Sequence, residues 1–211
     1  YGCSGNTSPN VDKFASGATR FERVISQATI TGPSVGSFMT SRYPQSIVIP
    51  GMQDMPGVPE SLPTLAEVLK DHGYSTGAVI SNLLVQRRMG FAQGFDYYNE
   101  RLMYQDITSP EVLEIGQIWM RHAKRKPFFT FLLFMDPHTP YIRHKEYPSY
   151  PARKGKLGDR VEILDEEALK ASQLVTADEA AYLKSLYAGE LNFTDRYFGQ
   201  LVDWLREQKL Y

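Results

Sequence analysis

The feature that most constrains the fold is a nearly continuous apolar run, Phe128–Met135, in which Thr130 is the only polar side chain. Strands of parallel sheets have this pattern because helices cover both of their faces. The run is far too short for a membrane span, which needs roughly 20 apolar residues. A second run, Thr76–Asn82, is apolar at first and ends in polar side chains. We predict that the two runs are neighbouring buried strands of one sheet.

Helices are predicted in five segments, from N-terminal signals and from apolar residues at helical spacing. They are Ser8–Ala15, Pro33–Ser41, Ser61–Gly73, Pro110–Lys124 and a long helix that starts at the capping box Thr176–Glu179. Helices that alternate with strands predict an α/β fold, with a largely parallel central sheet flanked by helices on both faces. The segment Gly51–Pro59 is expected to be a surface loop, and the polar stretch 143–175 an irregular insertion.

Composition excludes several classes of protein. Hydrophobic residues make up 42% and charged residues 22% of the 211 residues, as in an ordinary globular domain. The formal net charge is -1, so no basic excess points to nucleic acid. Cys3 is the one cysteine, so neither an internal disulfide nor a cysteine-based zinc site can form.

Polar residues that could carry chemistry follow both predicted strands and begin one helix. Ser81–Asn82 and Asp136–Tyr141, which contains His138, come after the strands, where α/β proteins gather their active residues. Thr31–Ser34 begins a helix, whose N-terminus suits an anionic tetrahedral group. A hydroxyl there could attack phosphorus or sulfur if a metal or a base activated it. Two structural alternatives stay open: Thr31 or Ser34 caps the helix, and His138 is hydrogen-bonded within a proline-rich turn.

Six segments carry motifs in a fixed order along the chain: Tyr1–Phe21, Thr31–Pro44, Leu62–Thr76, Phe91–Asp96, Phe128–Tyr141 and Tyr187–Tyr211. Their order resembles that of the sulfatase family in the alkaline phosphatase superfamily. The resemblance implies that residues 1–211 are the central part of one sulfatase-like catalytic domain. It also implies that the two metal motifs of the family lie just before Tyr1 and just after Tyr211. We therefore expect an internal fragment, inactive by itself, whose other metal ligands lie outside this chain.

The same resemblance assigns roles to four residues. Thr31 occupies the position of the nucleophile, which also binds a divalent metal (Ca, Mg, Mn or Zn, which the sequence does not distinguish). His138 is implied as a catalytic residue, and Asn82 and Ser34 as substrate-binding residues. The implied reaction is metal-dependent hydrolysis of a sulfate or phosphate ester, either a small molecule or one linked to a glycan or lipid. No nucleic-acid partner and no membrane span are expected in this segment, and the resemblance favours an extracytoplasmic location.

Three departures from the family pattern leave alternatives open. The nucleophile position holds Thr31 where sulfatases have Cys or Ser, Val35 replaces an arginine, and Ile80–Leu83 replaces a Gly-Lys-x-His segment. A threonine is more similar to the phosphodiesterase branches of the superfamily. One alternative is therefore a phosphoryl-group transferase of the phosphoethanolamine or phosphoglycerol type. The other is a catalytically inactive sulfatase-like binding module, because three of the usual sulfate contacts are absent.

Overall fold

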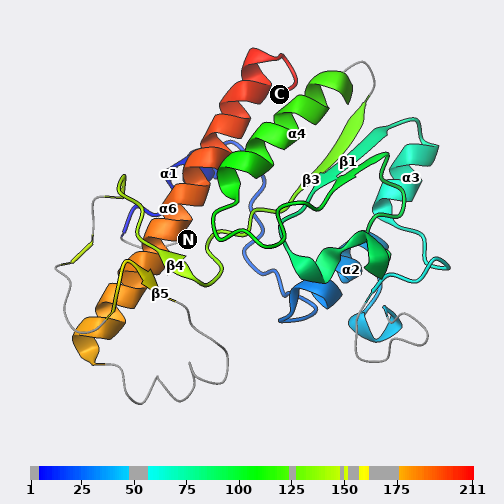
Figure 1. Ribbon diagram of the computed structural model, residues 1–211. Coiled ribbons are helices and arrows are strands. Elements are labelled where there is room, and N and C mark those ends of the chain that lie inside the picture. Colours follow the sequence, from blue (N-terminus) through cyan, green and yellow to red (C-terminus); the bar gives the residue numbers. More distant parts are fainter. Residues whose placement is uncertain (1–4, 48–56, 124–126, 148–149, 152–156, 162–175) are drawn as a thin grey trace. The chain divides into compact units, whose positions relative to one another are not determined.

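The computed structural model describes residues 5–47, 57–123, 127–147, 150–151, 157–161 and 176–211 (Figure 1). The chain divides into two compact units, residues 21–134 and residues 1–20 together with 135–211. Cys3 and most of the expected loop Gly51–Pro59 lie outside the described residues, as does much of the expected insertion 143–175. That insertion and the proposed domain bounds stay predictions.

The unit of residues 21–134 is built on a parallel sheet. Its described strands are β1 (Ser75–Val79), β2 (Tyr97–Asn99) and β3 (Phe128–Leu132), in the order β2-β1-β3. Both pairings are parallel, and Ala78 of β1 lies opposite Phe131 of β3. The prediction of two neighbouring strands is confirmed, although β1 is largely buried and β3 is only half-buried at every position. β3 ends at Leu132, earlier than the apolar run suggested, although the Leu133 N–H still donates to the Val79 carbonyl.

Helices cover both faces of this sheet (Figure 1). One face packs against α2 (Thr31–Thr40) and α3 (Leu65–Asp71), and the other against α4 (Ser109–Ala123). The first core joins these helices to β1, through Val35, Met39, Ala66, Ala78 and Ile80. The second core joins α4 to the sheet, through Val79, Val112, Ile115 and Leu132. The predicted fold class is therefore confirmed, and buried apolar area on both faces holds the unit together.

Glycines let α4 approach the sheet closely. A Cβ at Gly77 of β1 would lie 2.4 Å from the indole of Trp119, and one at Gly116 would lie 2.9 Å from Leu132. The position of the Trp119 indole over β1 thus depends on the absence of a side chain at Gly77. Such contacts are tighter than real Cβ atoms allow, so any added methyl group must displace a neighbour.

The apolar side chains of α3 do not all face the core. Leu65 and Val68 are 40% and 46% exposed, whereas Ala66 is fully buried. The reason is a close backbone approach: Gly94, at φ 79°, would place a Cβ 2.2 Å from the Glu67 nitrogen. The helix therefore packs through its smallest residue, which helical periodicity alone does not indicate. Gly73, the last residue of the predicted helical segment, has the left-handed backbone that is typical of a helix C-terminus, with φ 85°.

The unit of residues 1–20 and 135–211 is organised around α6 (Ala177–Glu207). The predicted capping box of Thr176 and Glu179 starts this helix. α1 (Pro9–Ser16) packs against α6 and is tied to it by the buried Asp195, which accepts hydrogen bonds from the backbone N–H groups of Asn10 and Val11 at 2.9 and 2.8 Å. Two short antiparallel strands, β4 (Tyr141–Ile142) and β5 (Arg160–Val161), complete the described part of the unit.

Candidate active site

Thr31 is the first residue of α2. The predicted helix is present, but it starts at Thr31 rather than at Pro33. The N-cap position belongs to Ile30, whose side chain carries no hydrogen-bonding group. Within the described ranges no backbone N–H donates to the Thr31 hydroxyl, so the simple capping alternative finds no support there. The hydroxyl is therefore available at a helix N-terminus, where the positive end of the helix dipole favours negative charge.

Asn82 is the described side chain that contacts Thr31. It follows β1 and is only 6% exposed. Its Nδ2 lies 3.5 Å from Thr31 Oγ1, and its Oδ1 accepts a hydrogen bond of 2.8 Å from the Leu84 N–H. The hydrogen bond from the Leu84 N–H to Asn82 Oδ1 caps the short 3-10 helix η2 (Leu83–Val85). The structure thus brings together two predicted site residues that lie 51 positions apart, at the carboxyl end of the central strand.

Ser34 lies in the first turn of α2. Its N–H donates to the Ile30 carbonyl at 3.2 Å, and its hydroxyl lies 3.1 Å from the hydroxyl of Ser26. Because Ser26 donates its own proton to the Ala28 carbonyl at 2.6 Å, Ser34 is the donor of this pair. The substrate-binding role of Ser34 stays a prediction.

His138 is exposed and belongs to the other compact unit. Its backbone N–H donates to the Met135 carbonyl, and its Nδ1 lies 2.7 Å from the Thr139 carbonyl. A carbonyl only accepts, so Nδ1 carries the proton and Nε2 of the neutral ring is an acceptor. The turn therefore fixes the tautomer of His138. Its role beside Thr31 stays a prediction, because the two residues lie in separate units.

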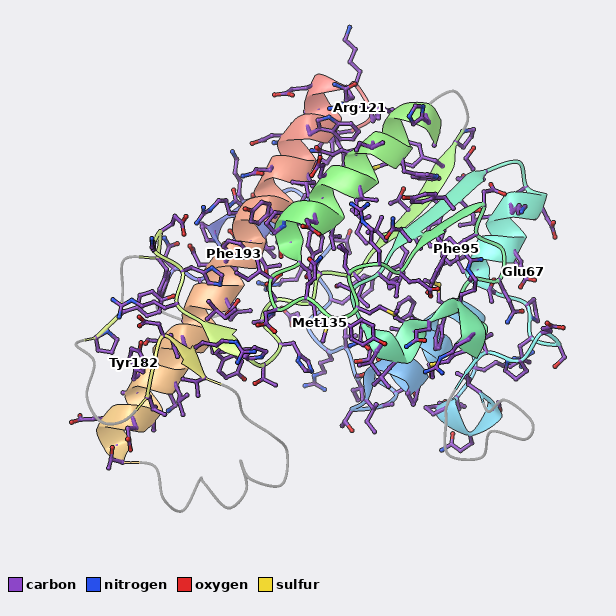
Figure 2. All side chains as sticks on the ribbon, in the orientation of Figure 1. Glu67, Phe95, Arg121, Met135, Tyr182 and Phe193 are labelled. Carbon is purple, nitrogen blue, oxygen red and sulfur yellow. The ribbon has the colours of Figure 1, made fainter. Side chains whose placement is uncertain are left out.

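A buried pair in the second unit was not predicted. His144 Nε2 lies 2.8 Å from Glu190 Oε2, and the two side chains are 5% and 3% exposed. The other oxygen of Glu190 accepts the Ile142 N–H at 2.6 Å, and the His144 ring stacks at 3.9 Å on Phe193 of α6. Phe193 is labelled in Figure 2. The pair joins β4 to α6, which is a structural role. One sequence signal could have indicated this buried pair. Glu190 lies one helical turn from both Leu186 and Phe193, so its carboxylate falls on the apolar stripe of α6.

The described residues do not form the metal site that the resemblance implies. No three of their His, Cys, Asp or Glu side chains lie close enough to hold a metal ion. The described neighbour of Thr31 is an amide, whereas hard divalent cations need several oxygen ligands. We derive no step through a metal from this part of the chain. The expectation that Thr31 shares a metal with ligands outside residues 1–211 stays a prediction.

The sulfatase family model matches residues 1–211. The chain belongs to the sulfatase family. Over 93 residues it is 34% identical to steryl-sulfatase of Homo sapiens, which covers 37% of this chain and 15% of that protein. Over 81 residues it is 36% identical to arylsulfatase A of Bos taurus, with 36% and 16% covered. The predicted family is thus confirmed, while the matched region spans a small part of these relatives.

Solved structures confirm the fold. The lipoteichoic acid synthase LtaP from Listeria monocytogenes superposes with a TM-score of 0.64 at 15% identity, over 97% of this chain and 47% of that one. Ps i-CgsB, in complex with k-i-k-neocarrahexaose, gives a TM-score of 0.61 at 20% identity, over 97% and 50%. A protein of the alkaline phosphatase superfamily from Vibrio parahaemolyticus gives 0.57 at 18% identity. The chain therefore spans about half the length of these relatives. No helix in the described ranges could cross a bilayer.

Proposed function

We propose that this sulfatase-family protein hydrolyses sulfate or phosphate esters, with Thr31 as its nucleophile. The observation that carries the proposal is the Thr31 hydroxyl at the start of α2, 3.5 Å from the buried Asn82 amide at the carboxyl end of β1. Ligands in open α/β folds bind at this end of the strands. Membership of the sulfatase family supports a hydrolase of sulfuric esters.

The proposed chemistry is nucleophilic substitution at sulfur or phosphorus. The Thr31 oxygen forms a bond to the central atom, and the bond to the alcohol of the ester breaks. The first turn of α2 then stabilises the negative oxygens of the transferred group, as N–H groups at helix N-termini do for phosphate. Water releases the group from Thr31 in a second step. His138 would contact the substrate or the leaving group, and Ser34 the substrate.

A phosphoryl-group transferase is the second candidate. Thr31 stands where sulfatases have Cys or Ser, and the fold resembles that of a lipoteichoic acid synthase. In this reaction an acceptor alcohol replaces water in the second step. The third possibility, an inactive binding module, is favoured by the absence of cations at Val35 and in Ile80–Leu83.

We propose glycan-linked or lipid-like esters as substrates. The proposal draws on relatives named for a steroid sulfate and solved with a neocarrahexaose. An extracytoplasmic location, and a divalent metal bound partly by Thr31, belong to the same proposal.

Turnover of two chromogenic esters tests the proposed function. The intact protein should release 4-nitrophenol from 4-nitrophenyl sulfate or bis(4-nitrophenyl) phosphate, and Thr31→Ala should abolish this release. Thr29→Ala, two residues earlier and exposed, is the matched control and should keep full turnover. Added glycerol separates the two candidates, because a transferase yields a glycerol ester and a hydrolase yields free sulfate or phosphate. Full turnover in Thr31→Ala would reject Thr31 as nucleophile, and no turnover by the wild type would favour the binding module.

A further inference from the structure

The amide of Asn82 has one fixed orientation. The Leu84 N–H can only donate, so the Asn82 atom 2.8 Å from it must be the oxygen. The nitrogen therefore faces the other way, and it lies 3.5 Å from Thr31 Oγ1. Because the cap of η2 uses the acceptor, the amide presents a donor to the Thr31 oxygen. The usual ambiguity between the two ends of an asparagine side chain does not arise here.

The backbone that carries Asn82 is held on both sides. The Ile80 N–H donates to the carbonyl of Asn99, the last residue of β2, and the buried Ser81 hydroxyl donates to the Leu133 carbonyl just beyond β3. On the other side of the pair, Val35 of α2 and the fully buried Val85 of η2 belong to one apolar cluster. Both partners of the contact therefore stand on packed elements of the same unit, which fixes a functional group better than a mobile loop does.

We propose that Asn82 is a positioning residue for the Thr31 hydroxyl, a role that rests on the proposed function of Thr31. The Asn82 N–H group occupies one lone pair of the Thr31 oxygen and restricts the side chain to one rotamer, with another lone pair left for attack. A donor to this oxygen also favours its deprotonated form over the hydroxyl. The contact is long for a neutral pair, and it shortens as negative charge develops on the oxygen.

The substitution Asn82→Asp separates this role from the cap. Aspartate has the same shape and still accepts the Leu84 N–H, but it presents an oxygen to Thr31 in place of the N–H donor. Asn99 offers a matched control, since its Oδ1 accepts the Arg101 N–H at 3.2 Å and its Nδ2 donates to the Tyr97 hydroxyl at 2.9 Å. Asn99→Asp therefore makes the same chemical change, in the same kind of turn, next to a different hydroxyl.

Kinetics of the intact protein with the two chromogenic esters give the first test. Asn82→Asp should lower kcat roughly 100-fold, the usual cost of losing one preorganised donor. It should also move the acid limb of the pH profile of kcat to higher pH, because a carboxylate opposes negative charge on the Thr31 oxygen. Asn99→Asp should change neither quantity. If Thr31→Ala is inactive while Asn82→Asp keeps the wild-type kcat and pH profile, the positioning role is wrong and the nucleophile assignment stands.

A second measurement does not depend on turnover. Scalar couplings to the Thr31 methyl group report its rotamer by NMR: one rotamer is expected in the wild type and in Asn99→Asp, and averaged values in Asn82→Asp. If Asn82→Asp fails to fold, Asn82→Ser replaces it in this measurement. The serine hydroxyl can accept the Leu84 N–H but is too short to reach Thr31. One unchanged Thr31 rotamer in either Asn82 variant would overturn the proposal, even if the protein proves inactive towards both esters.

Discussion

The Glu190 carboxylate lies 2.8 Å from Nε2 of His144, and both side chains are almost completely buried. Glu190 also accepts the N–H of Ile142, the last residue of β4, so a single side chain of α6 holds the end of β4 and the residue His144 just after it. Both contacts are lost if the carboxylate is removed. The buried partner would then be left without an acceptor, which is costly.

Removal of this carboxylate should therefore destabilise the unit that contains α6. We expect Glu190→Ala to lower the free energy of unfolding by about 1 to 3 kcal/mol, the usual cost of leaving a buried polar group without its partner. Glu207→Ala, at the exposed end of the same helix, should change it by less than about 0.5 kcal/mol. Denaturant titration measures both values. Equal stability of the two variants would show that the pair contributes no net stability.

The packing of Trp119 on Gly77 gives a prediction for the other unit. Gly77→Ala adds a methyl group 2.4 Å from the indole, so we expect a loss of about 1 to 3 kcal/mol from overpacking. Gly17→Ala is the control, because its Cβ would meet no atom closer than 4.0 Å. Thermal melting compares the two. A melting temperature of Gly77→Ala equal to that of the control would contradict the close packing of α4 on the sheet.

Tyr98 should make the protein sensitive to alkaline pH. Burial of its ring, helped by the nearby Glu100 charge and opposed by Arg87, raises the pKa of Tyr98 well above its ordinary value of 10.0. The unfolded tyrosine ionises first, so this contribution to stability is complete below about pH 10 and is lost as the pH rises further. Tyr98→Phe should therefore reduce the fall in stability above about pH 10. Tyr104→Phe should not reduce it, because Tyr104 is 82% exposed. Free energies of unfolding measured below and above about pH 10 test this prediction. An identical pH dependence in the two variants would show that Tyr98 is not the source of the alkaline sensitivity.

Local sequence patterns predicted the elements that depend on local physics. The apolar runs at Thr76 and Phe128 predicted the two strands, because short, nearly continuous apolar runs are typical of strands that helices cover on both faces. The capping box at Thr176 marked the start of α6, because its hydrogen bonds span only three residues. The helix start at Thr31 was predicted to within two residues.

Other features depend on contacts between distant segments and were not predictable in this way. The burial of Ala66 in α3 does not follow from helical spacing, because it depends on Gly94, which brings the backbone against Ala66 from 28 residues away in sequence. The partner of Glu190 is 46 residues away, and periodicity says nothing about it. The proximity of Thr31 and Asn82 was expected from the family resemblance, whereas the cap that orients the Asn82 amide became visible only in the structure.

The nature of residue 31 gives a further prediction about the reaction. Thr31→Ser keeps the hydroxyl and should retain part of the turnover of bis(4-nitrophenyl) phosphate, whereas Thr31→Ala should retain none. The melting temperatures of both variants should stay within a few degrees of the wild type, because the N-cap position of α2 belongs to Ile30 and Thr31 makes no capping hydrogen bond in the part of the chain that the structure describes. Equal turnover by Thr31→Ser and Thr31→Ala would show that the hydroxyl takes no part in the reaction.

The most direct test of the central claim is capture of the covalent intermediate. The intact protein is mixed with either ester, quenched in acid during turnover, digested, and analysed by mass spectrometry for the peptide that contains Thr31. The proposed mechanism predicts a peptide heavier by one sulfuryl or phosphoryl group, with the group on Thr31, and no such peptide from Thr31→Ala. Turnover accompanied by a group on a different residue, or by the same modified peptide in Thr31→Ala, would contradict the assignment of Thr31 as the nucleophile.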